Sequence, residues 1–343
     1  MRAFVTGTAG FIGFHLAKRL LAEGHAVIGY DGLTPYYDLN LKQRRHAQLK
    51  SQHGFTPIVG MLEDKALLCK SIAEARPDVI FHLAAQAGVR HSLEDPDAYG
   101  SSNLVGTLNL LEAARAAPPR HLLFASTSSV YGSSEKVPFI EADATDRPVS
   151  LYAASKKAGE AMTHAYAHLF SLPTTCFRFF TVYGPWGRPD MALYRFVEAI
   201  EAGRTIDVFG EGRMLRDFTY VDDLVQAVLR LAEAVPQQGA PVSGVDSLSP
   251  IAPWRVVNVG GAQPVSLIDF IAAIESALGK SAQRRLLPMQ PGDVPVTAAD
   301  VRLLRALTGD VPTTPLDHGI RAFVDWYRSE ISAIEAGSQV TSL

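Results

Sequence analysis

Three closely spaced glycines near the N-terminus, Gly7, Gly10 and Gly13, limit what this chain can fold into more than any other feature. They follow a short apolar run, residues 3–5. They precede a segment, residues 12–20, in which apolar side chains recur every fourth position, as on one face of a helix. Because glycine has no side chain, the backbone can turn sharply and approach another group closely at these positions. The stretch therefore predicts a buried strand, a tight turn and a helix.

The residues after this helix complete a larger unit. Gly24 ends the helical pattern, and a second apolar run, residues 26–28, leads to Asp31. Strand, glycine turn, helix, strand and acid in this order bind a dinucleotide, with the pyrophosphate at the helix N-terminus. Because a carboxylate holds ribose hydroxyls and repels a 2′-phosphate, Asp31 favours NAD over NADP. The predicted contacts in this unit are Gly7, Gly10, Phe11, Ile12, Gly13 and Asp31.

The composition is that of an ordinary globular protein, with 343 residues, of which 47% are hydrophobic and 20% charged. A net charge of −3 gives no indication of a nucleic-acid partner or a basic membrane-binding patch. The sequence has no apolar run long enough to span a membrane, and its N-terminus leads directly into a strand, so we expect a cytoplasmic protein. Cys69 and Cys176 lie in apolar runs and are predicted to be buried free thiols. The ten histidines lack the spacing of a metal site, so no metal is predicted.

Strand and helix patterns alternate through the first half of the chain. Further strands are predicted at residues 56–59, 78–83, 121–125 and 174–179, and helices at 64–76, 101–116 and 152–170. Alternation of this kind predicts an α/β fold, a Rossmann-type doubly wound parallel sheet with helices on both faces. Ligands of such sheets bind beyond the carboxyl ends of the strands.

From residue 181 the predicted elements become short and mixed, which indicates a smaller C-terminal α/β domain for the substrate. Two segments, near 218–231 and 256–260, are predicted to return to the first domain. The predicted boundaries are 1–180 for the cofactor domain, 181–335 for the substrate domain, and 336–343 for a polar tail after a last helix near 319–329.

Tyr152 and Lys156 lie four residues apart at the start of a predicted helix, and so on one face of it. A hydroxyl-rich loop, residues 126–129, follows the strand at 121–125. A nearby ammonium group and the positive ring of an oxidised nicotinamide would lower the pKa of the tyrosine from about 10. Tyr152 could then accept a proton from a sugar hydroxyl while a hydride leaves for the cofactor.

These segments resemble the extended short-chain dehydrogenases/reductases of the NAD-dependent epimerase/dehydratase family, which act on nucleotide sugars. The resemblance covers nearly the whole chain, through TGTAGFIG, HLAAQAGVR, NLVGTLNLLEA, STSSVYG, YAASK, RFFTVYGPWGRPDMA, RDFTYVDD, NVGG and PMQPGDV. The chain looks most similar to the bacterial and plant UDP-glucuronate 4-epimerases, which interconvert UDP-glucuronate and UDP-galacturonate through a 4-keto sugar. The resemblance implies tightly bound NAD, a UDP-sugar substrate and a homodimer.

The resemblance also implies roles for single residues. Thr127 matches the catalytic Ser/Thr of the family, and Tyr152 matches its base. The residues implied to line the cofactor are Leu83, Ala84, Ala85, Gln86, Asn103, Ser126, Tyr152 and Lys156. Those implied to meet the nucleotide are Met191 and Ala192 through their backbone, Phe209 against the uracil, and Arg216 at the diphosphate.

Three positions depart from the pattern of the wider family, one of which is Thr181, where relatives that act on neutral hexoses carry asparagine. Many relatives carry an aspartate that contacts adenine where Met61 follows Gly60 in this chain, so Leu62 or Glu63 is expected to make that contact instead. Relatives also carry an arginine in place of Gln290. Its loss would leave Arg216 with more of the diphosphate charge.

The loop after the strand at 121–125 limits the range of reactions that the site is expected to catalyse. Dehydratases and decarboxylases similar to this chain carry carboxylates where it has Ser128 and Ser129, so elimination is disfavoured. We expect Ser128, Ser129 and Thr181 to hold the C6 carboxylate of a hexuronate, with Arg188 or Arg90 supplying charge. The alternatives are a 4-epimerase of UDP-glucose or UDP-N-acetylglucosamine, a UDP-glucuronate decarboxylase, and a non-catalytic NAD-binding scaffold.

Overall fold

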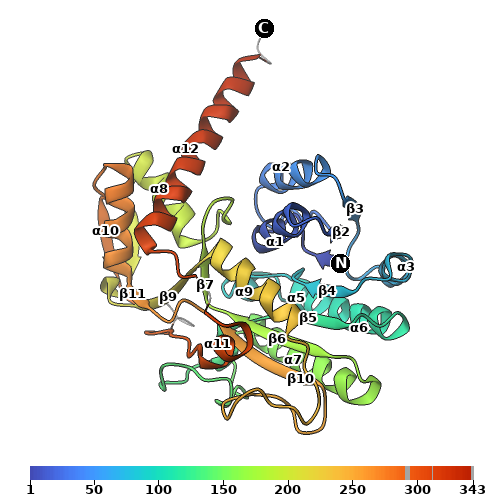
Figure 1. The fold of residues 1–343 in the computed structure, drawn as a ribbon. Coiled ribbons are helices and arrows are strands. Elements are labelled where there is room, and N and C mark those ends of the chain that lie inside the picture. Colours follow the sequence, from blue (N-terminus) through green and yellow to red (C-terminus); the bar gives the residue numbers. More distant parts are fainter. Residues whose placement is uncertain (290–293, 311, 341–343) are drawn as a thin grey trace.

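The computed structural model describes residues 1–289, 294–310 and 312–340. Its main feature is a parallel sheet of seven strands in the order β10-β6-β5-β4-β1-β2-β3 (Figure 1). The strands are β1 (Arg2–Thr6), β2 (Ala26–Asp31), β3 (Phe55–Val59), β4 (Val79–His82), β5 (His121–Thr127), β6 (Thr174–Phe179) and β10 (Trp254–Val259). The predicted doubly wound parallel sheet is confirmed.

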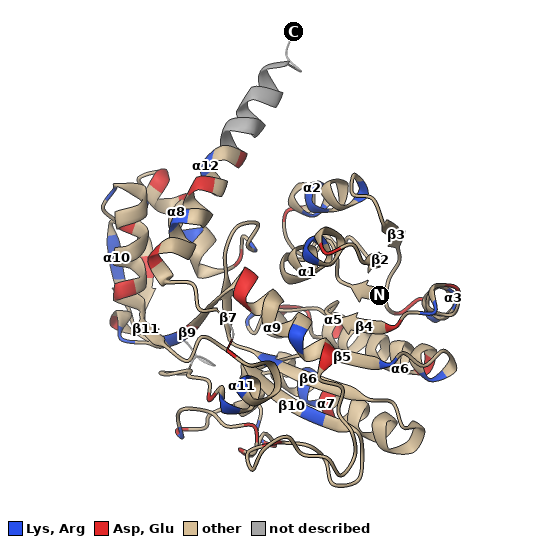
Figure 2. Cartoon of the chain, viewed as in Figure 1, with Lys and Arg blue, Asp and Glu red and all other residues tan. Residues whose placement is uncertain are grey.

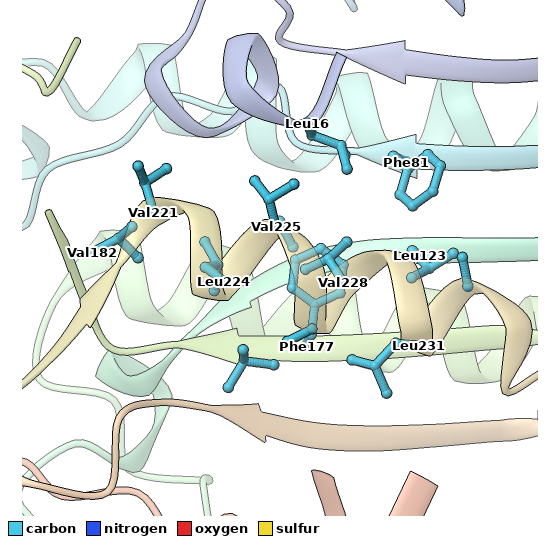
Figure 3. Packing of buried hydrophobic residues seen from close by; sticks show 14 of the residues in the cluster. Leu16, Phe81, Leu123, Phe177, Val182, Val221, Leu224, Val225, Val228 and Leu231 are labelled. Carbon is cyan, nitrogen blue, oxygen red and sulfur yellow. The ribbon is translucent and has the colours of Figure 1, made fainter. Parts of the chain in front are cut away.

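Helices cover both faces of this sheet (Figure 1). One face carries α1 (Phe11–Ala22), α2 (Leu39–Lys50) and α9 (Val221–Glu233), and the other α3 (Lys65–Ala75), α6 (Gly106–Ala116) and α7 (Leu151–Phe170). Helix α9 packs there because apolar residues recur at three- and four-residue spacing along it. Figure 3 shows this row of side chains, Val221, Leu224, Val225, Val228 and Leu231, packed over Leu123 and Phe177 of the sheet.

A second, smaller group of elements has its own apolar core. Its strands are β7 (Thr181–Tyr183), β8 (Ile206–Phe209), β9 (Leu215–Tyr220), β11 (Pro264–Ser266) and β12 (Arg284–Leu287), which form a three-stranded sheet, β11-β9-β7, and a two-stranded one, β12-β8. Its longer helices are α8 (Ala192–Glu201), α10 (Leu267–Leu278) and α12 (Leu316–Val340). The domain boundaries stated above stay a prediction.

Ion pairs tie the helices of this smaller group together. Glu201 of α8 accepts a hydrogen bond from Arg328 of α12 at 2.6 Å and also pairs with Lys280, just after α10. Acidic and basic residues accordingly lie close together on these helices in Figure 2. Exposed pairs of this kind each stabilise a fold only slightly, so the apolar core beneath them carries most of the packing.

Short elements fill the connections. They are α4 (His91–Glu94), α5 (Pro96–Tyr99), the π-helix η1 (Gly100–Val105), the 3₁₀ helices η2 (Ser128–Tyr131) and η3 (Gly210–Gly212), and α11 (Arg302–Thr308). The helix predicted over 101–116 is therefore a π-helical segment followed by α6. Within the described residues, none of the helices is both long and apolar enough to cross a membrane.

Two expectations about the chain were wrong in detail. Helix α12 continues to Val340, past its predicted end at 329, and extends from the body of the protein (Figure 1). Cys69 is only partly buried, whereas Cys176 is buried as expected, and both are free thiols. Residues 341–343 of the predicted tail and Gln290 lie outside the described residues. The cytoplasmic location stays a prediction.

A buried arginine joins the two groups of elements. Arg45 of α2 is fully buried, and its Nη1 donates to the Ala9 carbonyl at 2.9 Å and to the Tyr37 hydroxyl at 2.7 Å. Its Nη2 donates to the carbonyls of Trp186 at 2.5 Å and Gly187 at 3.3 Å. One side chain therefore connects the glycine turn to the segment that leads from β7 to α8.

Candidate active site

The glycine turn brings β1, α1 and the end of β4 into close contact. A Cβ added at Gly13 would lie 2.0 Å from the Gly7 carbonyl oxygen, and one at Gly7 would lie 2.8 Å from the Ala84 nitrogen. Gly7 also has a φ of +82°, which favours glycine. Helix α1 begins at Phe11 after Gly10, and within the described residues its N-terminus is capped by no side chain. Its first N–H groups therefore remain available to an anion.

Asp31 is held beside this turn at the end of β2. Its Oδ2 accepts a hydrogen bond from the Ala9 nitrogen at 2.8 Å, and its Oδ1 accepts one from the Leu33 nitrogen at 2.8 Å. Each carboxylate oxygen keeps acceptor capacity after these bonds, which a ribose hydroxyl can use. The position of Asp31 therefore fits the predicted contact.

The loop after β4 contains Leu83, Ala84, Ala85 and Gln86. The Thr6 hydroxyl of β1 accepts hydrogen bonds from the nitrogens of Leu83 at 3.1 Å and Ala84 at 3.0 Å, which fixes the start of this loop.

Asn103 fixes the end of the same loop. Its Oδ1 accepts from the Gln86 nitrogen at 2.8 Å, and its Nδ2 donates to the Gln86 carbonyl at 3.0 Å and to the Ser155 hydroxyl at 2.9 Å. The Asn103 amide therefore ties the loop to α7, and its own polar atoms are used in doing so.

Asn109 of α6 lies at the expected adenine contact and was missed from the sequence. Its Nδ2 donates to the carbonyls of Leu62 at 3.0 Å and Glu63 at 3.4 Å, so the Leu62 carbonyl is already hydrogen-bonded. The Glu63 Oε2 atom is buried and has no hydrogen-bond partner within the described residues. A buried acceptor of this kind is available to an amino group. A polar residue on the apolar side of a helix was the signal for Asn109.

Tyr152 lies in the first turn of α7, where the Ser150 hydroxyl accepts from the Ala153 nitrogen at 3.1 Å and caps the helix. Its ring meets that of Tyr99 edge-on at 6.2 Å. Burial raises the pKa of the Tyr152 phenol, while a hydrogen bond with the Thr127 side chain and the charge of Arg188 lower it. Lys156 is not among the groups that shift this pKa, and burial outweighs Thr127 and Arg188, so the expected lowering of the pKa is not seen.

Lys156 is 5% exposed, and its ammonium lies 5.0 Å over the ring of Phe124. Burial lowers its pKa to about 8, although Cys176 and Glu160 oppose this. Among the described residues its Nζ has no hydrogen-bond acceptor, which is unusual for a buried cation. The ammonium is therefore a donor that a bound ligand can satisfy.

Ser126 belongs to a buried ion-pair network that was not foreseen. Its hydroxyl donates to Glu160 Oε1 at 2.6 Å, and Glu160 accepts two hydrogen bonds from Arg178, each at 2.8 Å. Although burial raises it, Arg178 and Ser126 hold the pKa of Glu160 below its usual value. The Ser126 side chain thus supports β5, β6 and α7. Glu160 could have been noticed, since it lies four residues after Lys156 on the same helix.

The hydroxyl-rich loop folds into η2. The Thr127 Oγ1 accepts from the Ser129 nitrogen at 3.1 Å and donates to the Ser129 hydroxyl at 3.2 Å. Thr127 therefore fixes Ser129 and also reaches Tyr152. Ser128 is partly exposed at the same strand end.

A pocket lies between the start of α1 and the segment from β7 to α8. Its lining includes four predicted substrate residues, Thr181, Arg188, Met191 and Ala192, together with Phe11 from the predicted cofactor unit. The cavity itself measures only about 40 Å³, which is well below the roughly 300–1,000 Å³ that is common for small-molecule sites. The structure therefore brings residues from both halves of the chain to one pocket.

The remaining predicted residues lie in separate contacts. The guanidinium of Arg90 lies 5.3 Å over the ring of Phe209, the residue expected to stack on uracil. Arg90 does not line the pocket, whereas Arg188 does. Arg216 donates to the carbonyls of Leu215 at 3.0 Å and Pro295 at 3.3 Å. These contacts hold Arg216 at the edge of β9.

Comparisons with known proteins agree with this geometry. A family model described as the NAD dependent epimerase/dehydratase family matches residues 3–243. The chain belongs to this family. It is 58% identical over 330 residues to a probable UDP-glucuronate 4-epimerase of Rhizobium meliloti, covering 95% of this chain and 97% of the relative. It is 44% identical to UDP-glucuronate 4-epimerase 1 of Arabidopsis thaliana, covering 95% and 76%.

A solved structure of this epimerase/dehydratase family has the same fold. The UDP-glucuronic acid 4-epimerase from Bacillus cereus, in complex with UDP-glucuronic acid and NAD, superposes with a TM-score of 0.85 at 34% identity. The match covers 96% of this chain and 99% of that one.

Replacing Lys156 in this family member by methionine should raise its stability when no nucleotide is bound. The pKa of Lys156 is 10.5 in the unfolded chain and about 8 in the folded one. The charged side chain therefore destabilises the fold by roughly 3 kcal/mol below pH 8, and less as the pH rises from 8 to 10.5. Urea unfolding should show Lys156→Met more stable than the wild type by roughly 1–3 kcal/mol at pH 7, and by less at pH 9.

Lys70→Met is the matched control, because the Lys70 side chain is 70% exposed. It should change the free energy of unfolding by less than about 0.5 kcal/mol. A Lys156→Met protein less stable than the wild type at pH 7 would contradict the argument.

Proposed function

We propose that this protein is a UDP-glucuronate 4-epimerase that interconverts UDP-glucuronate and UDP-galacturonate with tightly bound NAD. The observation that carries the proposal is the placing of Tyr152 near enough to Thr127 and Arg188 for both to lower the pKa of its phenol, in a family member 58% identical to a probable enzyme of this activity. A non-catalytic scaffold would have no use for this arrangement.

The residues at the glycine turn fit NAD. The close approach at Gly7 and Gly13 leaves backbone where a pyrophosphate must come near, and the start of α1 offers free N–H groups. Asp31 would hold the adenosine ribose, and the unpartnered Lys156 ammonium would donate to hydroxyls of the nicotinamide ribose. When bound, NAD⁺ supplies a hydride acceptor and a positive charge near Tyr152.

Tyr152 is proposed as the base that takes the proton from the sugar C4 hydroxyl, and as the acid that returns it. Thr127 would hydrogen-bond the same oxygen, because its side chain reaches the Tyr152 hydroxyl. The 4-keto sugar formed between these steps must turn in the site and present its other face. Tyr152 then protonates the oxygen of the product.

A hexuronate oxidised at C4 is a β-keto acid, which loses carbon dioxide readily when its carboxylate aligns with the ketone π system. We propose that Ser128, Ser129 and Thr181 hold the C6 carboxylate out of this alignment, with Arg188 supplying charge. Arg188 and Thr181 line the same pocket, and hydroxyl groups at 128 and 129 cannot serve as an acid–base pair for elimination. This favours epimerisation over decarboxylation.

For the nucleotide, we propose backbone contacts from Met191 and Ala192, stacking of uracil on Phe209, and a diphosphate contact from Arg216. Support comes from the pocket lined by Met191 and Ala192 and from the cation already stacked on the Phe209 ring. The guanidinium of Arg90 there marks a face that a planar base can use.

The function is tested by incubating the purified protein with UDP-glucuronate and no added cofactor, then resolving the products by chromatography and NMR. We expect UDP-galacturonate with no loss of carbon. Tyr152→Phe should lower the rate by about 10²–10⁴-fold, since the phenol proton transfer is removed. A UDP-pentose with carbon dioxide would indicate a decarboxylase, turnover only of UDP-glucose or UDP-N-acetylglucosamine a neutral-sugar epimerase, and no turnover a scaffold.

Arg188→Ala should weaken binding of UDP-glucuronate far more than binding of UDP, because only the former carries the sugar carboxylate. Loss of a charged hydrogen bond of this kind predicts a change of about tenfold or more in the dissociation constant. Calorimetry with both ligands measures it. Equal losses for the two ligands would rule out contact between Arg188 and the carboxylate.

We propose that the protein forms a homodimer through η1, α6 and α7. Large apolar side chains there are exposed, including Val105 at 49%, Leu108 at 42% and Leu169 at 67%. Sedimentation velocity should show a dimer that Leu108→Asp converts to a monomer, because a charge would be buried in the interface. The exposed loop variant Ile251→Asp should stay dimeric. A wild-type monomer would contradict the proposal.

A further inference from the structure

Arg188 is held by a carboxylate of the protein itself. Its Nε donates to Oδ1 of Asp190 at 3.0 Å, and its Nη2 donates to Oδ2 at 2.5 Å, so the pair is bidentate. The Tyr36 hydroxyl donates to the same Oδ2 at 3.3 Å, and the Arg188 guanidinium lies 5.6 Å over the Tyr36 ring. The three side chains form a compact cluster beside the pocket.

We propose that Asp190 is an internal carboxylate that competes with the sugar carboxylate for Arg188 and thereby sets the affinity of the site for a uronate. The inference rests on the proposed function, in which Arg188 contacts the C6 carboxylate. Asp190 acts through Arg188 and is a positioning residue, whereas Arg188 touches the substrate.

The geometry indicates that this competition weakens the binding of a uronate. Asp190 occupies the Nε–Nη2 edge of the guanidinium, which is an edge that a planar carboxylate binds bidentately. A sugar carboxylate must either displace Asp190 from this edge or bind another edge and share the charge with it. Two carboxylates on one guanidinium repel each other, so both routes weaken uronate binding.

Asp190 offsets the positive electrostatic potential that Arg188 and two nearby cations, Lys42 and Arg45, produce around it. Arg188 lies close enough to Lys42 and Arg45 that its charge helps to lower the pKa of each, after burial, which is the largest cause. Of these three cations Arg188 lines the pocket, and without Asp190 the group would have one fewer carboxylate to offset its charge. Removing its charge should therefore strengthen the attraction for a uronate.

Accessibility agrees with this arrangement. The Arg188 side chain is 20% exposed and that of Asp190 is 33% exposed, so neither needs the fold to open before the pair can rearrange. Among the described residues Arg188 lines the pocket and Asp190 does not, so a ligand meets the guanidinium rather than the carboxylate.

Moderate rather than tight binding of the sugar carboxylate suits an epimerase. The keto sugar must turn over between the two proton transfers, and its carboxylate must leave one set of contacts and enter another. An internal carboxylate that takes Arg188 back during this turn lowers the barrier to release, because the guanidinium is never left without a partner.

The test is binding of UDP, UDP-glucose and UDP-glucuronate to the NAD-loaded protein, measured by calorimetry in a Tyr152→Phe background to prevent turnover. Asp190→Asn keeps the shape of the side chain and removes its charge. We expect it to bind UDP-glucuronate about three- to tenfold more tightly, with UDP and UDP-glucose unchanged. With Tyr152 intact, Asp190→Asn should lower the KM for UDP-glucuronate without raising kcat.

Two controls separate this effect from a general change in the protein. Asp300 also binds an arginine two positions away in the sequence, Arg302, but neither residue lines the pocket. Asp300→Asn should therefore change none of the three affinities. In an Arg188→Ala background, Asp190→Asn should have no effect, because its action passes through Arg188. Asp190→Ala should tighten uronate binding as Asp190→Asn does.

The outcomes are distinguishable. Weaker or unchanged binding of UDP-glucuronate by Asp190→Asn, a raised KM, or an equal change for UDP would overturn the inference, since each indicates that Asp190 only supports the position of Arg188. If the protein with Asp190 in place binds UDP-glucuronate no better than UDP-glucose, the proposed function itself fails. If it does discriminate and Asp190→Asn does not tighten binding, the inference alone fails.

Discussion

The buried guanidinium of Arg45 is the contact on which the arrangement of the site depends. It donates to the Ala9 carbonyl in the glycine turn and to the carbonyls of Trp186 and Gly187, which immediately precede Arg188. Both Nη atoms of this fully buried cation find acceptors, whereas its Nε has none within the described residues, so moving these segments apart would leave still more of its donors unsatisfied. The cofactor turn and the substrate segment are thereby held in one geometry.

Around this contact the site contains two ionisable groups whose charged forms are made unfavourable by burial. Burial raises the pKa of Tyr152 and lowers that of Lys156 to about 8. Near pH 7 the charged Lys156 weakens the fold, whereas the Tyr152 phenol is neutral and does not, and such a cost persists where binding or catalysis needs the group. Next to Lys156 on α7, Glu160 forms a buried bidentate pair with Arg178 of β6, so each of these two charges has a partner. Removing either partner would leave the other charge buried and unpaired.

The sequence predicted most of the elements of the parallel sheet, because period and glycine spacing are local signals. It also predicted Asp31, and the structure holds this carboxylate beside the glycine turn. It did not reveal Asn109 or Asp190, and it assigned Ser126 to the cofactor although this hydroxyl donates to Glu160. Hydrogen bonds between residues far apart in the chain leave no periodic signal, so these partners could be found only after the segments were placed.

By itself the sequence determined the class of fold, and it predicted the cofactor unit and the groups that move a proton, since each follows from residue type at fixed local spacing. Tertiary structure decided which groups meet. It placed Arg188 in the pocket with Thr181 and near Tyr152, and Arg90 over Phe209. It also decided the pKa directions, because the degree of burial depends on helices and strands packed from distant parts of the chain.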